Sequence, residues 1–250
     1  MKIDLRDAAW RESLAATLTE AGEPASELSL QRLTEYFRQV TEVNKVMNLT
    51  AVTEPEDILK RHLADTLTLF AQAGIDELVA GRDSVRFADV GTGAGIPGFL
   101  IALLRPEWDV YLFDSLLKRL RFLDDVTANL GVRNVVTCHG RAEDLGRDPR
   151  YRETFDLVTA RAVAPLNVLL EYCLPFVRED GYFIAMKGDA ADEVAEAARA
   201  AGQLGGKLMR RNDFELAGTD WNRSLIIYRK IKKTPKRFPR KAGTPKARPI

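Results

Sequence analysis

The stretch from Phe87 to Phe99, "FADVGTGAGIPGF", constrains the fold most, because it places four glycines within eight residues directly after a short apolar run. Glycine adopts left-handed backbone angles and lets a ligand lie against the main chain. In a doubly wound α/β sheet, a nucleotide-like ligand binds where a strand leads through a glycine-rich turn into a helix. We therefore expect such a site here. A tight turn that binds nothing is the simpler alternative.

Strand patterns alternate with helix patterns from about residue 85 onward. We expect strands at 85–90, 109–114, 134–139, 155–160, 181–187, 207–216 and 221–230, with the clearest helices at 115–130 and 189–202. The first five strand–helix units predict parallel strands with right-handed crossovers, and the short connection 217–220 permits only a hairpin. The expected fold class is α/β: a seven-stranded, mostly parallel sheet with an antiparallel last strand.

Three regions are expected along the chain. Residues 1–80 read as a helical cap, in which Thr53 and Glu56 have the spacing of a capping box. Residues 81–230 form the ligand-binding domain. Residues 231–250 hold eight Lys/Arg, four prolines and no acid, whereas the other 230 residues hold 29 bases and 36 acids. A proline-rich run of like charge predicts an extended or disordered tail.

This basic tail has the composition of an RNA backbone clamp with one ring that could stack on a base. A disordered, solubilising end is the alternative. The candidate RNA-binding residues are Lys232, Lys233, Lys236, Arg237, Phe238, Arg240 and Lys241.

Two classes of nucleotide fit the glycine-rich stretch. Gly93, Gly95 and Gly98 match the G-x-G-x-x-G dinucleotide fingerprint, and Asp114 lies 21 residues beyond Gly93, where an acid would hold ribose hydroxyls. An NAD-dependent oxidoreductase is therefore one candidate. The glycines also fit a second pattern, Asp89-x-Gly91-x-Gly93-x-Gly95. In this pattern Asp89 lies at the end of the strand just before the first glycine. A carboxylate there would hold an ammonium and repel a pyrophosphate.

Two further features favour S-adenosylmethionine as the cofactor. Pro97 removes a backbone amide where a dinucleotide fold would present one to phosphate. Glu143 follows the strand at 134–139, where its side chain could accept a hydrogen bond from the amine of adenine. An ammonium, a ribose and an adenine edge together describe S-adenosylmethionine.

Seven ordered segments then resemble a known family. They are "NLTAV", "RHLADTL", "DVGTGAGIPG", "FDSLLKRLRFL", "GRAEDL", "ARAVAPL" and "MKG". Their order and spacing are similar to those of the bacterial 16S rRNA guanine-N7 methyltransferases, the RsmG (GidB) family, over roughly residues 30–230 and into the tail. The resemblance implies a class I, Rossmann-like methyltransferase that forms 7-methylguanosine in the 530 loop of 16S rRNA, at nucleotide 527 in standard rRNA numbering.

The resemblance also implies which positions contact the cofactor. These positions are Gly91, Ile96, Asp114, Ser115, Leu116, Ala142, Glu143 and Arg161. The glycine pattern itself adds Asp89, Gly93 and Gly95 to the expected cofactor residues. Relatives often have a small residue before the lysine of "SLLKR", so a backbone contact at Leu116 is a weaker implication than the one at Asp114.

The chemistry of guanine N7 requires no acid or base from the protein, because N7 is a lone-pair nucleophile without a proton to lose. Positioning alone can lower a barrier by roughly 7–11 kcal/mol. Arg161 and Lys187, at the ends of successive strands, are the positioning candidates; a salt bridge and an exposed strand-end lysine are the alternatives. His62 reads as a hydrogen-bonded core histidine, and no metal cluster is expected.

Bulk properties exclude other classes of protein. No apolar run has transmembrane length, and the first residues lack an apolar signal core, so we expect a cytoplasmic protein without a membrane partner. Cys138 and Cys173 read as structural thiols. The expected partner is 16S rRNA, the 30S subunit or its precursor, and nothing in the sequence requires more than a monomer. A non-catalytic ribosome assembly factor is the third candidate function.

Overall fold

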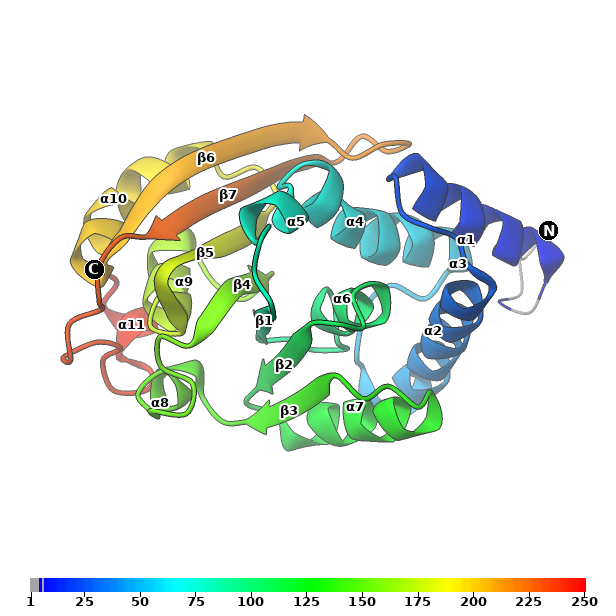
Figure 1. The fold of residues 1–250 in the computed structure, drawn as a ribbon, viewed down its shortest axis with the longest axis horizontal. Helices are drawn as coiled ribbons and strands as arrows, with labels where there is room; N and C mark the ends of the chain where they lie inside the picture. The colour runs from blue at the N-terminus through cyan, green and yellow to red at the C-terminus, as the bar shows by residue number, and fades with distance from the viewer. Residues whose placement is uncertain (1–4, 6) are drawn as a thin grey trace.

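The computed structural model describes residues 5 and 7–250, which form one sheet with helices on both faces (Figure 1). The described strands lie in the order β3-β2-β1-β4-β5-β7-β6. Their bounds are β1 Arg86–Val90, β2 Asp109–Asp114, β3 Val135–His139, β4 Phe155–Arg161, β5 Val177–Lys187, β6 Gly206–Glu215 and β7 Asn222–Lys230. The expected α/β class is confirmed. The last strand is antiparallel, and it lies between β5 and β6.

Each central strand sends alternate side chains to opposite faces of the sheet, as strand geometry requires. On β4, for example, Leu157 belongs to the first buried cluster and Val158 to the second. The first cluster packs under α6 (Gly98–Leu104) and α7 (Leu117–Asn129). The second packs under α8 (Ala142–Leu145), α9 (Leu166–Cys173) and α10 (Ala191–Leu204). Both cysteines are buried in this second cluster, as expected for structural thiols.

The N-terminal helices share the first cluster with the sheet. Their bounds are α1 Ala8–Glu20, α2 Glu27–Met47, α3 Pro55–Ile58, the π-helical segment η1 Leu59–Ala64, α4 Asp65–Ala71 and α5 Ile75–Leu78. The expected cap is therefore helical and is packed into the core of the sheet domain. Residues 1–4 and 6 of that cap lie outside the described residues. None of the helices in the described ranges has the length and apolar character needed to span a membrane.

The capping box expected at Thr53 and Glu56 is wrong. Glu54 occupies the N-cap position of α3, and no side chain among the described residues caps this helix. Pro55 lies in the first turn, where its missing N–H leaves no hydrogen bond unmade. Helix α2 ends at Asn48, which is its C-cap in a left-handed conformation that asparagine tolerates well.

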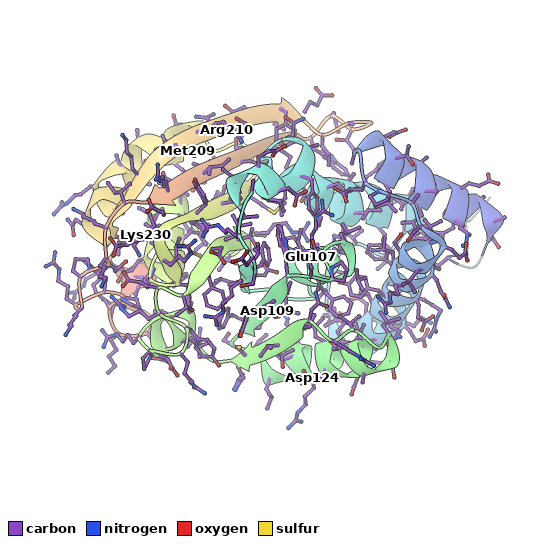
Figure 2. All side chains as sticks on the ribbon, in the orientation of Figure 1. Glu107, Asp109, Asp124, Met209, Arg210 and Lys230 are labelled. Atoms are coloured by element: carbon purple, nitrogen blue, oxygen red, sulfur yellow. The ribbon has the colours of Figure 1, made fainter. Side chains whose placement is uncertain are left out.

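The C-terminal tail is packed against the domain. In Figure 1 the red segment that ends in α11 (Thr244–Ala247) runs beside α8 and α9. Lys230, the last residue of β7, comes directly before the tail and is labelled in Figure 2. It is 0% exposed and forms an ion pair with Glu153 at 3.2 Å. The Lys230 ammonium also donates to the carbonyl of Leu174 and to the hydroxyl of Thr234. Burial lowers the pKa of Lys230 to about 8.

Candidate functional site

The glycine-rich loop joins β1 to α6 at the carboxyl edge of the sheet. Gly91, Gly93 and Gly95 have φ angles of +78°, +62° and +98°, in the region that favours glycine. The backbone N–H groups of Gly91 and Thr92 both donate to the carbonyl of Phe113 at the end of β2. The loop is thereby tied to the neighbouring parallel strand.

Asp89 organises this loop from below. Its carboxylate is 1% exposed and accepts hydrogen bonds from the Thr92 hydroxyl at 2.7 Å and the Gly98 N–H at 3.0 Å. Burial raises the pKa of Asp89. The other oxygen lies 3.3 Å from the Thr159 hydroxyl of β4. The expectation that Asp89 would help to hold an ammonium is therefore corrected: its carboxylate is buried beneath the loop and braces the loop, the start of α6 and β4.

Gly95 and Ile96 face the protein core. A Cβ atom on Gly95 would lie 2.7 Å from Leu123 and 2.9 Å from Phe99, so this glycine permits close packing of the loop on α6 and α7. Ile96 is buried in the first cluster. The structure thus places both residues behind the loop, away from the cavity where we expected them to contact the cofactor.

A cavity of about 290 Å³ lies in front of the loop, at the ends of β1, β2 and β4. It brings together five of the expected cofactor residues from three separate segments. The described lining residues are Val90, Gly91, Phe113, Asp114, Ser115, Arg119, Gly140, Arg141, Ala142, Glu143, Ala162, Val163 and Tyr172. We call it the donor cavity. Gly93 borders open space, because an added Cβ would have the Gly91 carbonyl as its nearest neighbour, at 3.9 Å.

Asp114 ends β2 in the wall of the donor cavity. Its carboxylate accepts hydrogen bonds from the N–H of Gly93 at 3.0 Å and from the N–H of Leu116 at 2.8 Å. Arg119 forms an ion pair with the same carboxylate at 3.4 Å. Asp114 therefore holds the tip of the glycine loop and the start of α7 in one geometry. Leu116 uses its N–H in this turn, and it is not among the described residues of the cavity wall.

Glu143 also lines the donor cavity, at the beginning of α8. Its carboxyl group is buried, and one oxygen accepts a hydrogen bond of 2.8 Å from the backbone N–H of Gly243 in the tail. No local sequence pattern predicts this contact, because the two residues are 100 positions apart.

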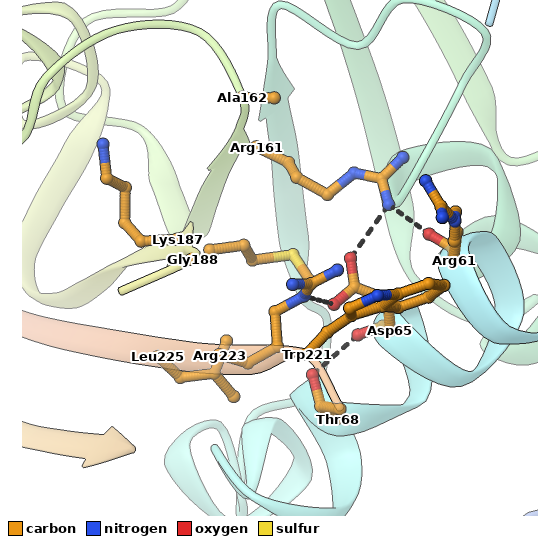
Figure 3. Close-up of a pocket in the computed structure, with 11 residues that line it drawn as sticks. Arg61, Asp65, Thr68, Arg161, Ala162, Lys187, Gly188, Trp221, Arg223 and Leu225 are labelled. Atoms are coloured by element: carbon orange, nitrogen blue, oxygen red, sulfur yellow. Dashed lines mark hydrogen bonds and ion pairs between the residues drawn. The ribbon is translucent and has the colours of Figure 1, made fainter. Parts of the chain in front are cut away.

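A second cavity of about 450 Å³ adjoins the first, and the two share Ala162 (Figure 3). We call it the acceptor cavity. Its described lining residues are Arg61, Asp65, Thr68, Arg161, Ala162, Met186, Lys187, Gly188, Trp221, Arg223 and Leu225. They come from η1, α4, the ends of β4 and β5, and the beginning of β7.

Asp65 is the centre of the acceptor cavity. One of its oxygens pairs with Arg161 at 3.0 Å and the other with Arg223 at 2.8 Å. The guanidinium carbon of Arg61 lies 4.1 Å from the ring centroid of Trp221, a cation–π geometry. Asp65, Trp221 and Arg223 were not expected in the site, although Asp65 belongs to the segment "RHLADTL".

The two positioning candidates both line the acceptor cavity. Arg161 forms a salt bridge, as its alternative interpretation expected, but with Asp65 of the N-terminal helices. Lys187 is not an exposed strand-end lysine: it pairs with Glu193 at 2.9 Å and donates to the Ala164 carbonyl at 3.1 Å. Both cations are therefore fixed in place at the edge of the cavity.

His62 is a core histidine, as expected. It is 5% exposed, and one ring nitrogen lies 3.0 Å from the Thr50 hydroxyl. Burial, reinforced by the charge of Arg161, lowers its pKa to about 4. The ring is therefore neutral at physiological pH.

The tail differs most from expectation. Phe238, expected as a stacking ring, is 4% exposed and belongs to the second core cluster. Arg240, expected on RNA, forms an ion pair with the fully buried Glu171. These contacts correct the expectation of an extended or disordered tail. They also remove Phe238 and Arg240 from the seven candidate RNA-binding residues. The other five are exposed: Lys232, Lys233, Lys236, Arg237 and Lys241.

Comparison with known proteins identifies the family. A family model described as "GidB: rRNA small subunit methyltransferase G" matches residues 29–216. The chain belongs to the rRNA small subunit methyltransferase G family. This membership confirms the resemblance carried by the seven segments and the expected class of enzyme, a methyltransferase rather than an oxidoreductase. S-adenosylmethionine is the methyl donor that enzymes of this class use.

Individual relatives are similar over most of their length. Ribosomal RNA small subunit methyltransferase G of Lactobacillus helveticus is 46% identical over 217 residues, 86% of this chain and 88% of the relative. The protein of the same name from Lactobacillus delbrueckii subsp. bulgaricus is 42% identical over 240 residues, 96% of this chain and 99% of the relative. Among solved structures, TrmN from Thermus thermophilus is 19% identical with a TM-score of 0.50, over 69% of this chain and 53% of TrmN. This last likeness concerns the fold alone.

Proposed function

We propose that the protein transfers the methyl group of S-adenosylmethionine to N7 of a guanosine in 16S rRNA. The observation that carries this proposal is the pair of adjoining cavities that meet at Ala162. One is lined by two buried carboxyl groups, and the other by four cations around a single described carboxylate. A nucleoside-type donor and a nucleic-acid acceptor require such a pair.

The donor cavity fits S-adenosylmethionine. Asp114 and Glu143 both line it, from the end of β2 and the beginning of α8, where they could accept hydrogen bonds from the ribose and from adenine. The open space at Gly93 leaves room for a ligand against the main chain, and any side chain there would occupy that space. When bound, the cofactor supplies an activated methyl group, so the protein has only to hold and orient it.

The acceptor cavity fits a guanosine of an RNA chain. Arginine and lysine are the common partners of the acceptor atoms on the guanine edge, and they also neutralise phosphate. Arg161 and Lys187 are positioned by ion pairs at this cavity, and Trp221 offers an aromatic ring at its rim. Because N7 has no proton to lose, these groups would orient the base without acting as acid or base.

The family resemblance suggests the target: nucleotide 527 in the 530 loop, in standard rRNA numbering. The 30S subunit or its precursor would then be the partner, a monomer would suffice for activity, and the cytoplasm would be the compartment. The five exposed tail cations support contact with the RNA backbone, since each can neutralise a phosphate.

A mapped methylation assay tests the proposal. The protein is incubated with labelled S-adenosylmethionine and either naked 16S rRNA or 30S particles from cells that lack this methylation. Chemical cleavage at 7-methylguanosine then locates the product. We expect incorporation at one guanosine of the 530 loop. Incorporation at another position would contradict the target, and no incorporation in either substrate would favour a non-catalytic assembly factor.

A further inference from the structure

We infer that the last ten residues, 241–250, form a wall of the donor cavity and set the affinity for the adenosyl cofactor before any RNA is bound. This inference rests on the proposed cofactor. It gives the tail a second role, distinct from the RNA contact that its charge suggests.

A third cavity, of about 520 Å³, shows where the wall stands. Its described lining includes Arg141, Glu143 and Tyr172, which also line the donor cavity. The other lining residues belong to the tail: Ala242, Gly243, Lys246 and Ala247. The tail therefore borders the space around Glu143.

Gly243 makes the contact that matters most. Its N–H donates to one oxygen of Glu143 at 2.8 Å, and it does so from a left-handed conformation with φ of +84°. A buried carboxylate needs a donor, and a fixed donor on one oxygen fixes the direction of the other. Within the described residues, the second oxygen of Glu143 is left as the acceptor for a ligand in the donor cavity.

The segment is held in this position by an anchor just before it. Arg240 meets the buried Glu171 through its backbone N–H at 2.7 Å and through its guanidinium at 2.5–3.0 Å. From the body of the protein, Arg147 donates to the carbonyl of Pro239, and Arg152 to that of Phe238. Because these contacts precede residue 241, removal of 241–250 leaves the anchor intact.

Two matched variants separate the effect of the tail wall on cofactor binding from the effect of the tail's positive charge. Deletion of residues 241–250 removes three cations together with the Gly243 donor. The control K232Q/K233Q/K236Q removes three exposed cations from the same tail and keeps the wall. Calorimetry with S-adenosylhomocysteine, without RNA, should give a Kd about tenfold higher for the deletion. The control should bind S-adenosylhomocysteine with a Kd within twofold of the wild-type value.

Turnover on RNA gives a second readout that a general loss of stability would not reproduce. The deletion should raise KM for S-adenosylmethionine, whereas the control should raise only KM for RNA and lower its salt dependence. G243P, which removes the N–H and forbids the positive φ, should reproduce the cofactor defect without removing any charge. Thermal unfolding of each variant checks that it is folded.

An unchanged cofactor Kd in both the deletion and G243P would overturn the inference, because the tail would then serve RNA alone. Tighter cofactor binding would also overturn it, since the tail would then obstruct the cavity. If the wild-type protein fails to bind S-adenosylhomocysteine, it is the proposed function that fails. The two failures are therefore distinguishable.

Discussion

The donor and acceptor cavities share a wall but differ in charge. The described lining of the donor cavity balances Asp114 and Glu143 against two arginines. Around the acceptor cavity, four cations surround Asp65 as the one acidic residue of its described lining. A balanced cavity suits a cofactor that carries charges of both signs, and a cationic one suits the edge of a polyanion. A variant on one side should therefore alter the binding of one substrate and spare the other.

The largest expected effect is on the donor side. G93V should weaken S-adenosylmethionine binding more than about 100-fold, because the new side chain enters the open space of the ligand. The matched control is G131V, since Gly131 has nearly the same φ, +60°, and also borders open space. Gly93 donates its N–H to Asp114 in the wall of the donor cavity, whereas Gly131 precedes β3 at the opposite edge of the sheet. Calorimetry measures both Kd values. Equal loss in the two variants would mean that backbone strain, and not the ligand's space, is responsible.

A smaller effect should appear on the acceptor side. W221A should lower kcat/KM for RNA by about 5- to 150-fold, the range for loss of one base-stacking ring at ~1–3 kcal/mol. Its Kd for S-adenosylmethionine should stay within twofold. L208A, which truncates a partly exposed side chain of β6, should change neither value. A loss of cofactor binding in W221A would break the division between the two cavities.

The smallest effect on methyl transfer is expected at His62, which neighbours Arg161 of the acceptor cavity and whose ionisation should alter stability instead. Its folded pKa of about 4 is below the ordinary value of 6.5, so the unfolded chain takes up the proton first as the pH falls. The contribution of the neutral His62 to the free energy of unfolding is therefore fully present above pH 6.5. It is lost as the pH falls from 6.5 to 4, by up to ~3 kcal/mol. H62Q should flatten this part of the curve, as measured by urea unfolding.

Above pH 6.5 the rate of methyl transfer should not depend on His62 ionisation. A profile of kcat that falls with the histidine pKa in the wild type, and not in H62Q, would show that the ring takes part in the reaction.

Much of the fold was predictable because its signals are local. The strand at 109–114 was predicted at its observed bounds, and the others to within a few residues. The signals for strands and glycine turns depend on residues that are neighbours in the sequence. The donor cavity followed for the same reason: Gly91, Asp114 and Glu143 each follow a strand, and the ends of parallel strands meet at one edge.

The rest depends on pairs that are distant in sequence. Asp65 and Arg223 are 158 positions apart, and Arg240 and Glu171 are 69 apart, so no local pattern announces either pair. Composition alone suggested a free tail, but the buried Glu171, the buried ring of Phe238 and the hydrogen bonds from Arg147 and Arg152 attach it. Asp89 was misread because its position fits a ligand contact and a loop brace equally well.

The most direct test is a crystal structure of the protein soaked with S-adenosylhomocysteine and guanosine monophosphate together. We predict the adenosyl group between Asp114 and Glu143, and the guanine beside Trp221 and Arg161 with its N7 turned toward the donor cavity. Adenosyl density in the acceptor cavity, or a donor cavity closed by protein atoms, would contradict the assignment of the two cavities.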